Sequence, residues 1–266
     1  MNRITKYLRV YRMLLKCALM KQMEYRVNFL LMIGIEGIFL VTKLLYSYIV
    51  YDTGVTIHGF SPDMIIFYIG TFILMSGIYM FLFYFNFSNI SSLIRQGDLD
   101  LLVTKPISLQ FILTMKQVDY GTPVPNIIAG GVIVIYQWNK IGISMDLVLI
   151  LGYIMCILLG SVVGYSVMFA VQLISFFTIK ADAVREITDS LWDINNMPMF
   201  IYNKYIRAVG CTVLPIFIVT NYPVLFVLKK LTHYQIIGGF LFCILLFCLV
   251  RKCFHYCMKR YTSASS

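Results

Sequence analysis

Long apolar runs separated by short polar stretches set the pattern of this chain. Four runs are continuous and cover residues 27–50, 64–87, 147–174 and 236–250, the last extending to Cys257. A helix needs about 20 mostly apolar residues to cross about 30 Å of hydrocarbon. Each run therefore predicts a membrane-spanning helix.

Two further stretches are apolar but irregular. Residues 111–138 are long enough for a span, yet Gly121, Pro123 and Pro125 interrupt them, which predicts two half-helices or a kink near the middle of the membrane. Residues 180–230 contain at least one more crossing. The pattern thus predicts an all-α, polytopic membrane protein with about six transmembrane helices, organised as one transmembrane domain over residues 1–266.

One predicted helix, residues 180–196, has two opposite stripes. It either lies along the cytoplasmic surface, leaving residues 206–228 as the fifth span, or crosses the membrane over residues 183–202. In the second case residues 206–228, broken by prolines, form a re-entrant pair on the outer side. The acidic stripe is Asp182, Glu186, Asp189 and Asp193, and the apolar stripe is Val184, Ile187, Leu191 and Ile194.

A polar insert, IRQGDLDLLVTKPIS at residues 94–108, separates the second and third predicted spans. Gly97 is able to end a helix by adopting a left-handed conformation, and Pro106 is able to end or begin one. The insert therefore predicts a short helix or loop with a fixed shape, which is what a docking surface needs.

The first 26 residues predict a second polar element. Basic residues spread over one side of a helix, and apolar and aromatic residues gather on the other. Such a helix lies in the cytoplasmic membrane interface or, alternatively, is only a solvated helix. The basic residues are Lys6, Arg9, Arg12 and Lys16, and the opposite face carries Ile4, Tyr7, Tyr11, Leu14 and Ala18.

Composition narrows the class of protein. A mean hydropathy of +0.82 with 13% charged residues is incompatible with a soluble domain. Most of the 22 Lys and Arg residues lie at those ends of the predicted spans that are next to the termini and the insert. These ends of the spans are therefore predicted to face the cytoplasm. The net charge of +10 then meets anionic lipid and does not indicate nucleic-acid binding.

Two charged residues, Glu36 and Lys43, fall inside the first predicted span. They lie seven residues apart, and therefore on nearly the same helix face, and neither is expected to face lipid. They either line a polar pathway or pair with polar groups of neighbouring helices, and Lys43 has the further option of reaching the outer surface.

Catalytic, cofactor and metal sites are not expected. The chain has no G-x-x-x-x-G-K-[ST] phosphate loop and no HExxH or GxSxG motif, so we expect no enzyme activity of its own. Cys253 and Cys257 share a helix face while His255 points away, so these three do not predict a metal site.

Three motifs together resemble the membrane subunit of an ATP-binding-cassette (ABC) exporter, in the small six-span subfamily of type 2 permeases. The motifs are GDLDLLVTKPIS at residues 97–108, MPMFIYNKYIRAVGCTVLPIFIVTNYPVLFVL at residues 197–228, and RYTSASS at residues 260–266. The acidic helix and the GTPVPN break at residues 121–126 depart from the family pattern.

The resemblance implies roles for particular residues. It implies a separate ATPase subunit that binds ATP and Mg, a second permease copy or a different permease as partner, and a multi-pass location in a bacterial plasma membrane. Residues 89–110 would be the cytoplasmic coupling segment, and residues 198–230 an outer re-entrant region containing Pro198, Pro215 and Pro223, which favours residues 183–202 as the fifth span. The implied coupling residues are Arg95, Gly97, Asp98, Asp100, Lys105 and Pro106, and spans one, two and five would line a pathway with Glu36, Lys43, Asp189 and Asp193.

Two other classes of protein stay open at this point. One is a membrane anchor or sensor subunit that transports nothing. The other is an ion-driven transporter, which would be expected to show repeated halves that this sequence lacks.

Overall fold

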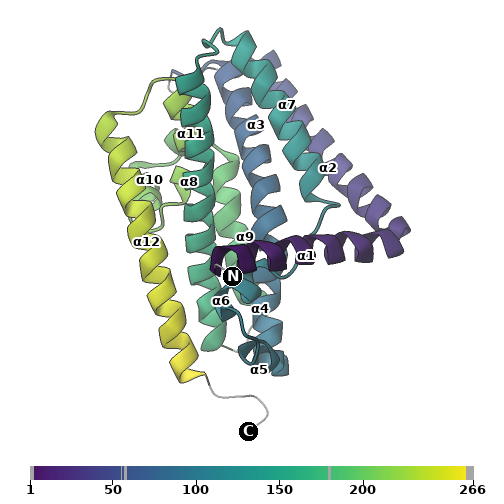
Figure 1. Ribbon diagram of the computed structural model, residues 1–266. Coiled ribbons are helices and arrows are strands. Elements are labelled where there is room, and N and C mark those ends of the chain that lie inside the picture. Colours follow the sequence, from purple (N-terminus) through teal and green to yellow (C-terminus); the bar gives the residue numbers. More distant parts are fainter. Residues whose placement is uncertain (1–2, 55, 57–58, 179–180, 262–266) are drawn as a thin grey trace.

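The computed structural model describes residues 3–54, 56, 59–178 and 181–261 (Figure 1). The described residues form an all-helical membrane protein, as predicted. Four of their helices are long and apolar enough to cross a membrane, or five if a bent pair counts as one span, so the predicted count of six stays a prediction.

A long central rod runs through the bundle. It consists of α3 (Pro62–Tyr79), a π-helical turn (Met80–Tyr84) and α4 (Phe85–Gln96), which together form one apolar span of 35 residues. The rod is the most deeply buried of the candidate spans, because helices cover it on several sides. It therefore forms the scaffold on which the other elements are placed.

The helix α7 (Pro123–Lys140) packs along the upper half of this rod. Their backbones approach so closely that a Cβ atom on Gly130 would overlap the backbone of Leu74, and glycine is therefore required at this contact. At the far end Lys140 forms an ion pair with Asp63, with Nζ and Oδ1 2.9 Å apart.

The predicted break in residues 111–138 lies at one end of α7 and not near its middle. The short helix α6 (Leu109–Met115) is followed by a non-helical stretch, and α7 then runs for 18 residues, about 27 Å. Pro123 and Pro125 occupy the first turn of α7, where the missing N–H groups have no helical partners to lose. These prolines therefore start a helix instead of kinking one.

The other side of the rod is covered by two helices, α8 and α11, and a 3₁₀ turn, with a third helix, α12, outside them. The helix α11 packs closely on α8, and α12 packs on the outer side of α8. Thr232 and Gln235 form a reciprocal capping box at the start of α12. The bounds are α8 Leu147–Gln172, its 3₁₀ extension Leu173–Phe176, α11 Ile216–Val227 and α12 His233–Arg260.

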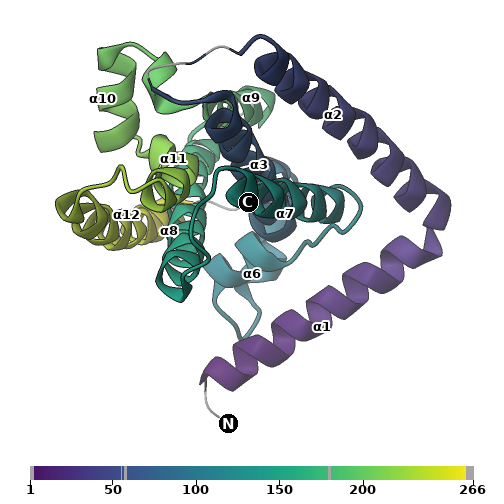
Figure 2. The same ribbon diagram turned by 90° about the horizontal axis from the view of Figure 1, so that it is seen from above.

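The first two helices stand apart from this core. The helix α1 (Arg3–Glu24) lies across the bundle, and α2 (Arg26–Asp52) rises from its end at an angle, so the two form an elbow at Tyr25 (Figures 1 and 2). The crosswise direction of α1 agrees with a helix that lies along a membrane surface. Most of the α2 surface has no protein neighbour among the described residues.

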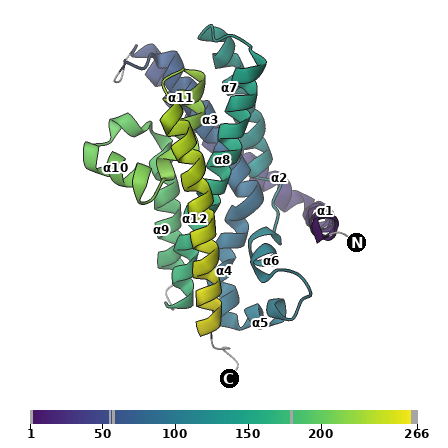
Figure 3. The ribbon, with the colours of Figure 1, turned by 60° about the vertical axis from the view of Figure 1, so that its left-hand side comes forward.

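The segment predicted to contain the fifth span is discontinuous. The helix α9 (Ala181–Asp193) runs alongside the bundle, as Figure 3 shows, and ends in 3₁₀ turns at Ile194–Asn196 and Met199–Ile201. The helix α10 (Lys204–Thr212) then points outward and meets α11 at an angle of 95°. Neither 183–202 nor 206–228 is a single helix, and which of the two is the fifth span stays a prediction.

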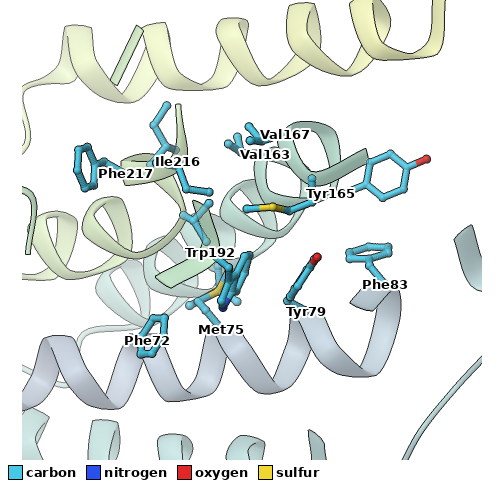
Figure 4. Close-up of a cluster of buried hydrophobic side chains, with 14 of the residues drawn as sticks. Phe72, Met75, Tyr79, Phe83, Val163, Tyr165, Val167, Trp192, Ile216 and Phe217 are labelled. Carbon is cyan, nitrogen blue, oxygen red and sulfur yellow. The ribbon is translucent and has the colours of Figure 1, made fainter. Parts of the chain in front are cut away.

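Buried side chains hold this break in place. The Tyr68 hydroxyl lies 2.9 Å from the Asn195 carbonyl, 3.0 Å from the Met197 carbonyl and 2.8 Å from the Thr220 hydroxyl. On α9, the Trp192 ring stacks on Tyr79 with centroids 4.0 Å apart (Figure 4). Backbone groups freed where a helix ends inside an apolar core need such partners, and the rod supplies them.

Candidate functional site

The polar insert forms a short, well-defined helix beyond the end of the rod. Gly97 ends α4 with φ +78° and ψ 0°, the left-handed conformation expected for it, and α5 (Asp98–Val103) begins at the next residue. The Asp100 amide donates to the Gly97 carbonyl at 3.1 Å, which closes the turn. Because α4 continues the rod, the position of α5 is fixed relative to the core of the bundle (Figure 3).

The two faces of α5 differ in exposure. Leu99 and Leu102 are buried against the bundle, whereas Leu101 is 66% exposed and Val103 is 50% exposed. The exposed apolar side chains are accompanied by the exposed charged residues Arg95, Asp98 and Lys105, while Asp100 is half-buried. This combination of apolar and charged groups at one tip is typical of a protein-docking surface.

The N-terminal helix binds the end of the insert. Lys6 Nζ donates to the Pro106 carbonyl at 2.7 Å, and the Ser108 amide donates to the Tyr7 hydroxyl at 3.2 Å. The Tyr7 ring also meets the Phe111 ring edge-on, with centroids 4.9 Å apart. We call α5, residues 104–108 and the Tyr7 end of α1 the coupling surface.

A second set of contacts ties α1 to the stretch before α7. Gln22 Nε2 donates to Asp119 Oδ2 at 3.0 Å, and Gln22 Oε1 accepts from the Tyr120 amide at 3.2 Å. The Tyr120 hydroxyl donates to the Leu15 carbonyl at 3.2 Å. Sequence reasoning missed these residues, because a hydrogen bond between positions about a hundred residues apart leaves no local pattern.

The other predicted basic residues of α1 do not join the coupling surface. Arg9, Arg12 and Lys16 are exposed, and no ion pair involves them within the described residues. Among the residues expected on the apolar face, Ile4 is exposed, while the remaining four are partly covered. The helix is thus amphipathic in the structure, with its basic side chains free to meet anionic groups.

Two of the four predicted pathway residues lie on α2, which packs against α3 and α7, and the other two lie on α9. Glu36 is buried, and its Oε1 accepts from Asn126 Nδ2 at 2.6 Å, so it pairs with a polar group of a neighbouring helix. Lys43 Nζ lies 5.7 Å from the centre of the Phe72 ring and within electrostatic reach of Glu36 and Asp193. Three of the four predicted pathway residues are therefore brought near one another.

Asp189, the fourth predicted pathway residue, lies one turn before Asp193 in α9. Its Oδ2 is 3.8 Å from Arg185 Nε, and both side chains are partly exposed. Asp193 accepts a hydrogen bond from Asn196 Nδ2 at 3.3 Å. The acidic stripe of α9 is thus mostly exposed, while Val184 and Trp192 on its other side are buried.

Two of the three prolines expected in a re-entrant region precede short helical elements, whereas the third does not break its helix. Pro198 precedes the 3₁₀ turn Met199–Ile201, Pro215 precedes α11, and Pro223 lies inside α11. Each of the first two positions begins a helix, where the fixed φ of proline fits and its missing N–H costs little.

The C-terminal end of α12 carries no cluster of metal ligands in the described residues. His255 Nδ1 lies 2.7 Å from the Arg251 carbonyl of its own helix, and the Arg260 guanidinium lies 4.8 Å from the centre of the Tyr256 ring. Of the RYTSASS motif only Arg260 and Tyr261 are described, and residues 262–266 lie outside the described part of the chain.

Comparison with known proteins identifies the family. Residues 38–265 match the sequence model of the family described as ABC-2 family transporter protein. This chain belongs to the ABC-2 transporter family. No curated protein and no solved structure matches the chain. Membership in the ABC-2 family indicates the membrane subunit of an ABC transporter, a class of proteins that works with an ATPase partner.

Proposed function

We propose that this ABC-2 family protein is the transmembrane subunit of an exporter, driven by a separate ATPase that docks on the coupling surface. The observation that carries the proposal is the rigid α5 tip, which exposes Leu101 and Val103 at the end of the central rod. In this proposal the partner binds ATP and Mg, and this chain supplies the path through the membrane.

Force applied to α5 reaches the core through two routes. The first is the rod itself, because α5 follows α4 across the single residue Gly97. The second is α1, because Lys6 and Tyr7 bind the end of the insert and Gln22 binds the stretch before α7. Closure of two ATPase subunits would therefore tilt the rod and α1 together and shift the bundle between two arrangements.

We place half of the path where α2 meets the bundle. Glu36 is bonded to Asn126 there, Lys43 lies within electrostatic reach of Glu36 and Asp193, and α2 leaves most of its surface uncovered. Charged groups at membrane depth are expected to face a cavity or a partner subunit and not lipid. A second permease, either a copy of this chain or a different one, would close the path. In this proposal α5 and both termini face the cytoplasm of a bacterial cell, and the bend between α10 and α11 forms the outer re-entrant region.

Co-purification tests the proposal directly. The tagged chain is purified from its native membrane in mild detergent, bound proteins are identified by mass spectrometry, and ATP hydrolysis by the eluate is measured. We expect an ABC-type ATPase. Leu101→Asp places a charge in the apolar contact and should weaken binding of the ATPase about tenfold or more.

The matched control is Tyr256→Asp, which makes the same kind of change at an exposed aromatic residue on α12. This variant should retain the ATPase. If no nucleotide-binding protein is recovered even after cross-linking, or if Leu101→Asp retains it fully, the docking role of α5 is wrong. An anchor or an ion-driven transporter would then be the better explanation.

A further inference from the structure

The inner side of the elbow between α1 and α2 contains a cavity that the coupling role does not use. Its volume is about 630 Å³, and α1, α2, Phe85 of α4 and the stretch 116–121 line it. Figure 2 shows α1 and α2 meeting at this elbow, with α6 and α7 inside the angle. A cavity of this size has room for a lipid headgroup and the first part of an acyl chain, and it is open to the surroundings of the bundle.

Two lysines give the cavity an unpaired positive charge. Lys21 of α1 and Lys116 after α6 both line it, and neither has an ion-pair partner within the described residues. Asp119 also lines the cavity, and its oxygens accept from Gln22 Nε2 at 3.0 Å and from the Thr122 amide at 3.1 Å, so the two lysines face a single carboxylate whose hydrogen bonds are already made. The cavity therefore offers two free ammonium groups to an anion.

The opposite wall of the cavity is apolar. Phe29 and Met32 lie one and two turns into α2, and Phe85 faces them from the rod. Because α2 rises away from α1, this wall continues in the direction of the membrane interior, away from the lysines (Figure 1). A small free anion would leave this wall without a partner, whereas an amphipathic ligand covers both parts.

We propose that this elbow cavity binds one anionic phospholipid of the cytoplasmic leaflet. Its phosphate lies between Lys21 and Lys116, and an acyl chain lies against Phe29 and Met32. The site rests on the membrane orientation given above but not on an ATPase partner. A lipid held here contacts α1, α2 and the stretch before α7 at once, so it stabilises the elbow in the arrangement described.

Labelling of a native thiol reports occupancy of the cavity. Cys17 lines the cavity and is exposed, and Cys253 is exposed on α12 outside it. The full chain is placed in nanodiscs of phosphatidylglycerol mixed with phosphatidylcholine, or of phosphatidylcholine alone, and maleimide labelling of both thiols is followed by peptide mass spectrometry. We expect phosphatidylglycerol to slow labelling of Cys17 and to leave Cys253 unchanged.

Variants distinguish lipid binding in the cavity from the general attraction of a basic helix to anionic lipid. Removal of both lysines, K21Q with K116Q, should weaken protection of Cys17 about 30-fold, since each lysine near an anionic surface contributes about one factor of five. The control pair, K16Q with K252Q, removes the same charge from exposed positions that do not line the cavity and should keep the protection.

A third variant tests the apolar wall of the cavity. It also keeps the proposal testable if the double variant does not fold. Ala18 lines the cavity, so Ala18→Trp fills space while keeping both lysines, and it should abolish the difference between the two lipid mixtures. Millimolar inorganic phosphate with phosphatidylcholine should not protect Cys17. Equal protection by both lipid mixtures, protection by inorganic phosphate alone, or full protection in the double variant would overturn the proposal.

Discussion

At the residue scale, single buried polar side chains bind groups that the apolar core would otherwise leave without a partner. Tyr68 meets two backbone carbonyls and a threonine hydroxyl at the break after α9, and Asn126 donates to Glu36 between α2 and α7. In an apolar surrounding, a freed carbonyl or a carboxylate without a donor is costly. Tyr68 therefore allows an irregular backbone after α9, and Asn126 allows a buried carboxylate on α2.

Replacement of Tyr68 by phenylalanine tests this role. The ring still fits, but the carbonyls of Asn195 and Met197 lose the hydroxyl whose single proton they share, so we expect a loss of about 1–3 kcal/mol in stability. The measurement is thermal unfolding in detergent. Tyr234→Phe is the control. Tyr234 is 89% exposed, so the melting temperature of this variant should equal that of the unchanged protein.

At the element scale, local patterns predicted the type of each helix better than its ends. The apolar runs and the amphipathic period of residues 1–26 lie in the predicted elements, and Gly97 takes the conformation that its lack of a Cβ permits. The position of the break before Pro123 and the end of α9 at Asp193 were not predictable. Both depend on contacts with side chains far away in sequence, such as Gln22 and Tyr68.

The contact between α3 and α7 gives an element-scale prediction. Gly130→Ala places a methyl group against the backbone of Leu74 and should force the helices apart at a cost of about 1–3 kcal/mol. Gly131→Ala is the matched control, since no atom lies within 4 Å of its added Cβ. An equal melting temperature for both variants would contradict the close packing described.

The turn at Gly97 gives a second prediction at the element scale. Gly97→Val forces a β-branched residue to φ +78°, which costs about 1–3 kcal/mol and should change the direction of α5. We expect lower ATP hydrolysis by the co-purified complex. Gly142→Val carries similar strain at φ +75° at the opposite end of the bundle, so hydrolysis that falls equally in both variants would point to stability and not to coupling.

At the scale of the whole molecule, the two ends of the bundle have different chemistry. One end brings together the coupling surface, the elbow cavity and the basic end of α12, whereas the other carries the Lys140–Asp63 ion pair and the cap of α12. The family match begins at residue 38, so it covers α5 and α12 but not α1 or the residues of α1 and α2 that line the elbow cavity.

Thiol labelling from either side of the membrane tests the proposed orientation. Cys253 lies at the coupling end of α12, and Tyr234→Cys adds an exposed thiol at its other end. In intact cells, a membrane-impermeant reagent should modify the cysteine at 234 and leave Cys253 unmodified. In inverted vesicles the result should be reversed, and labelling of Cys253 in intact cells would place the coupling surface outside.

The π-helical turn at Met80–Tyr84 determines how the residues that follow it are rotated about the axis of the rod. Such a turn inserts one residue relative to an uninterrupted α-helix, and one residue corresponds to about 100° of rotation about the axis. Without it, the inward-facing leucines of α5 would turn away from the bundle. In the proposed docking role, the angle at which the tip meets a partner would therefore be determined within the rod, by a single extra residue near the middle of its 35-residue span.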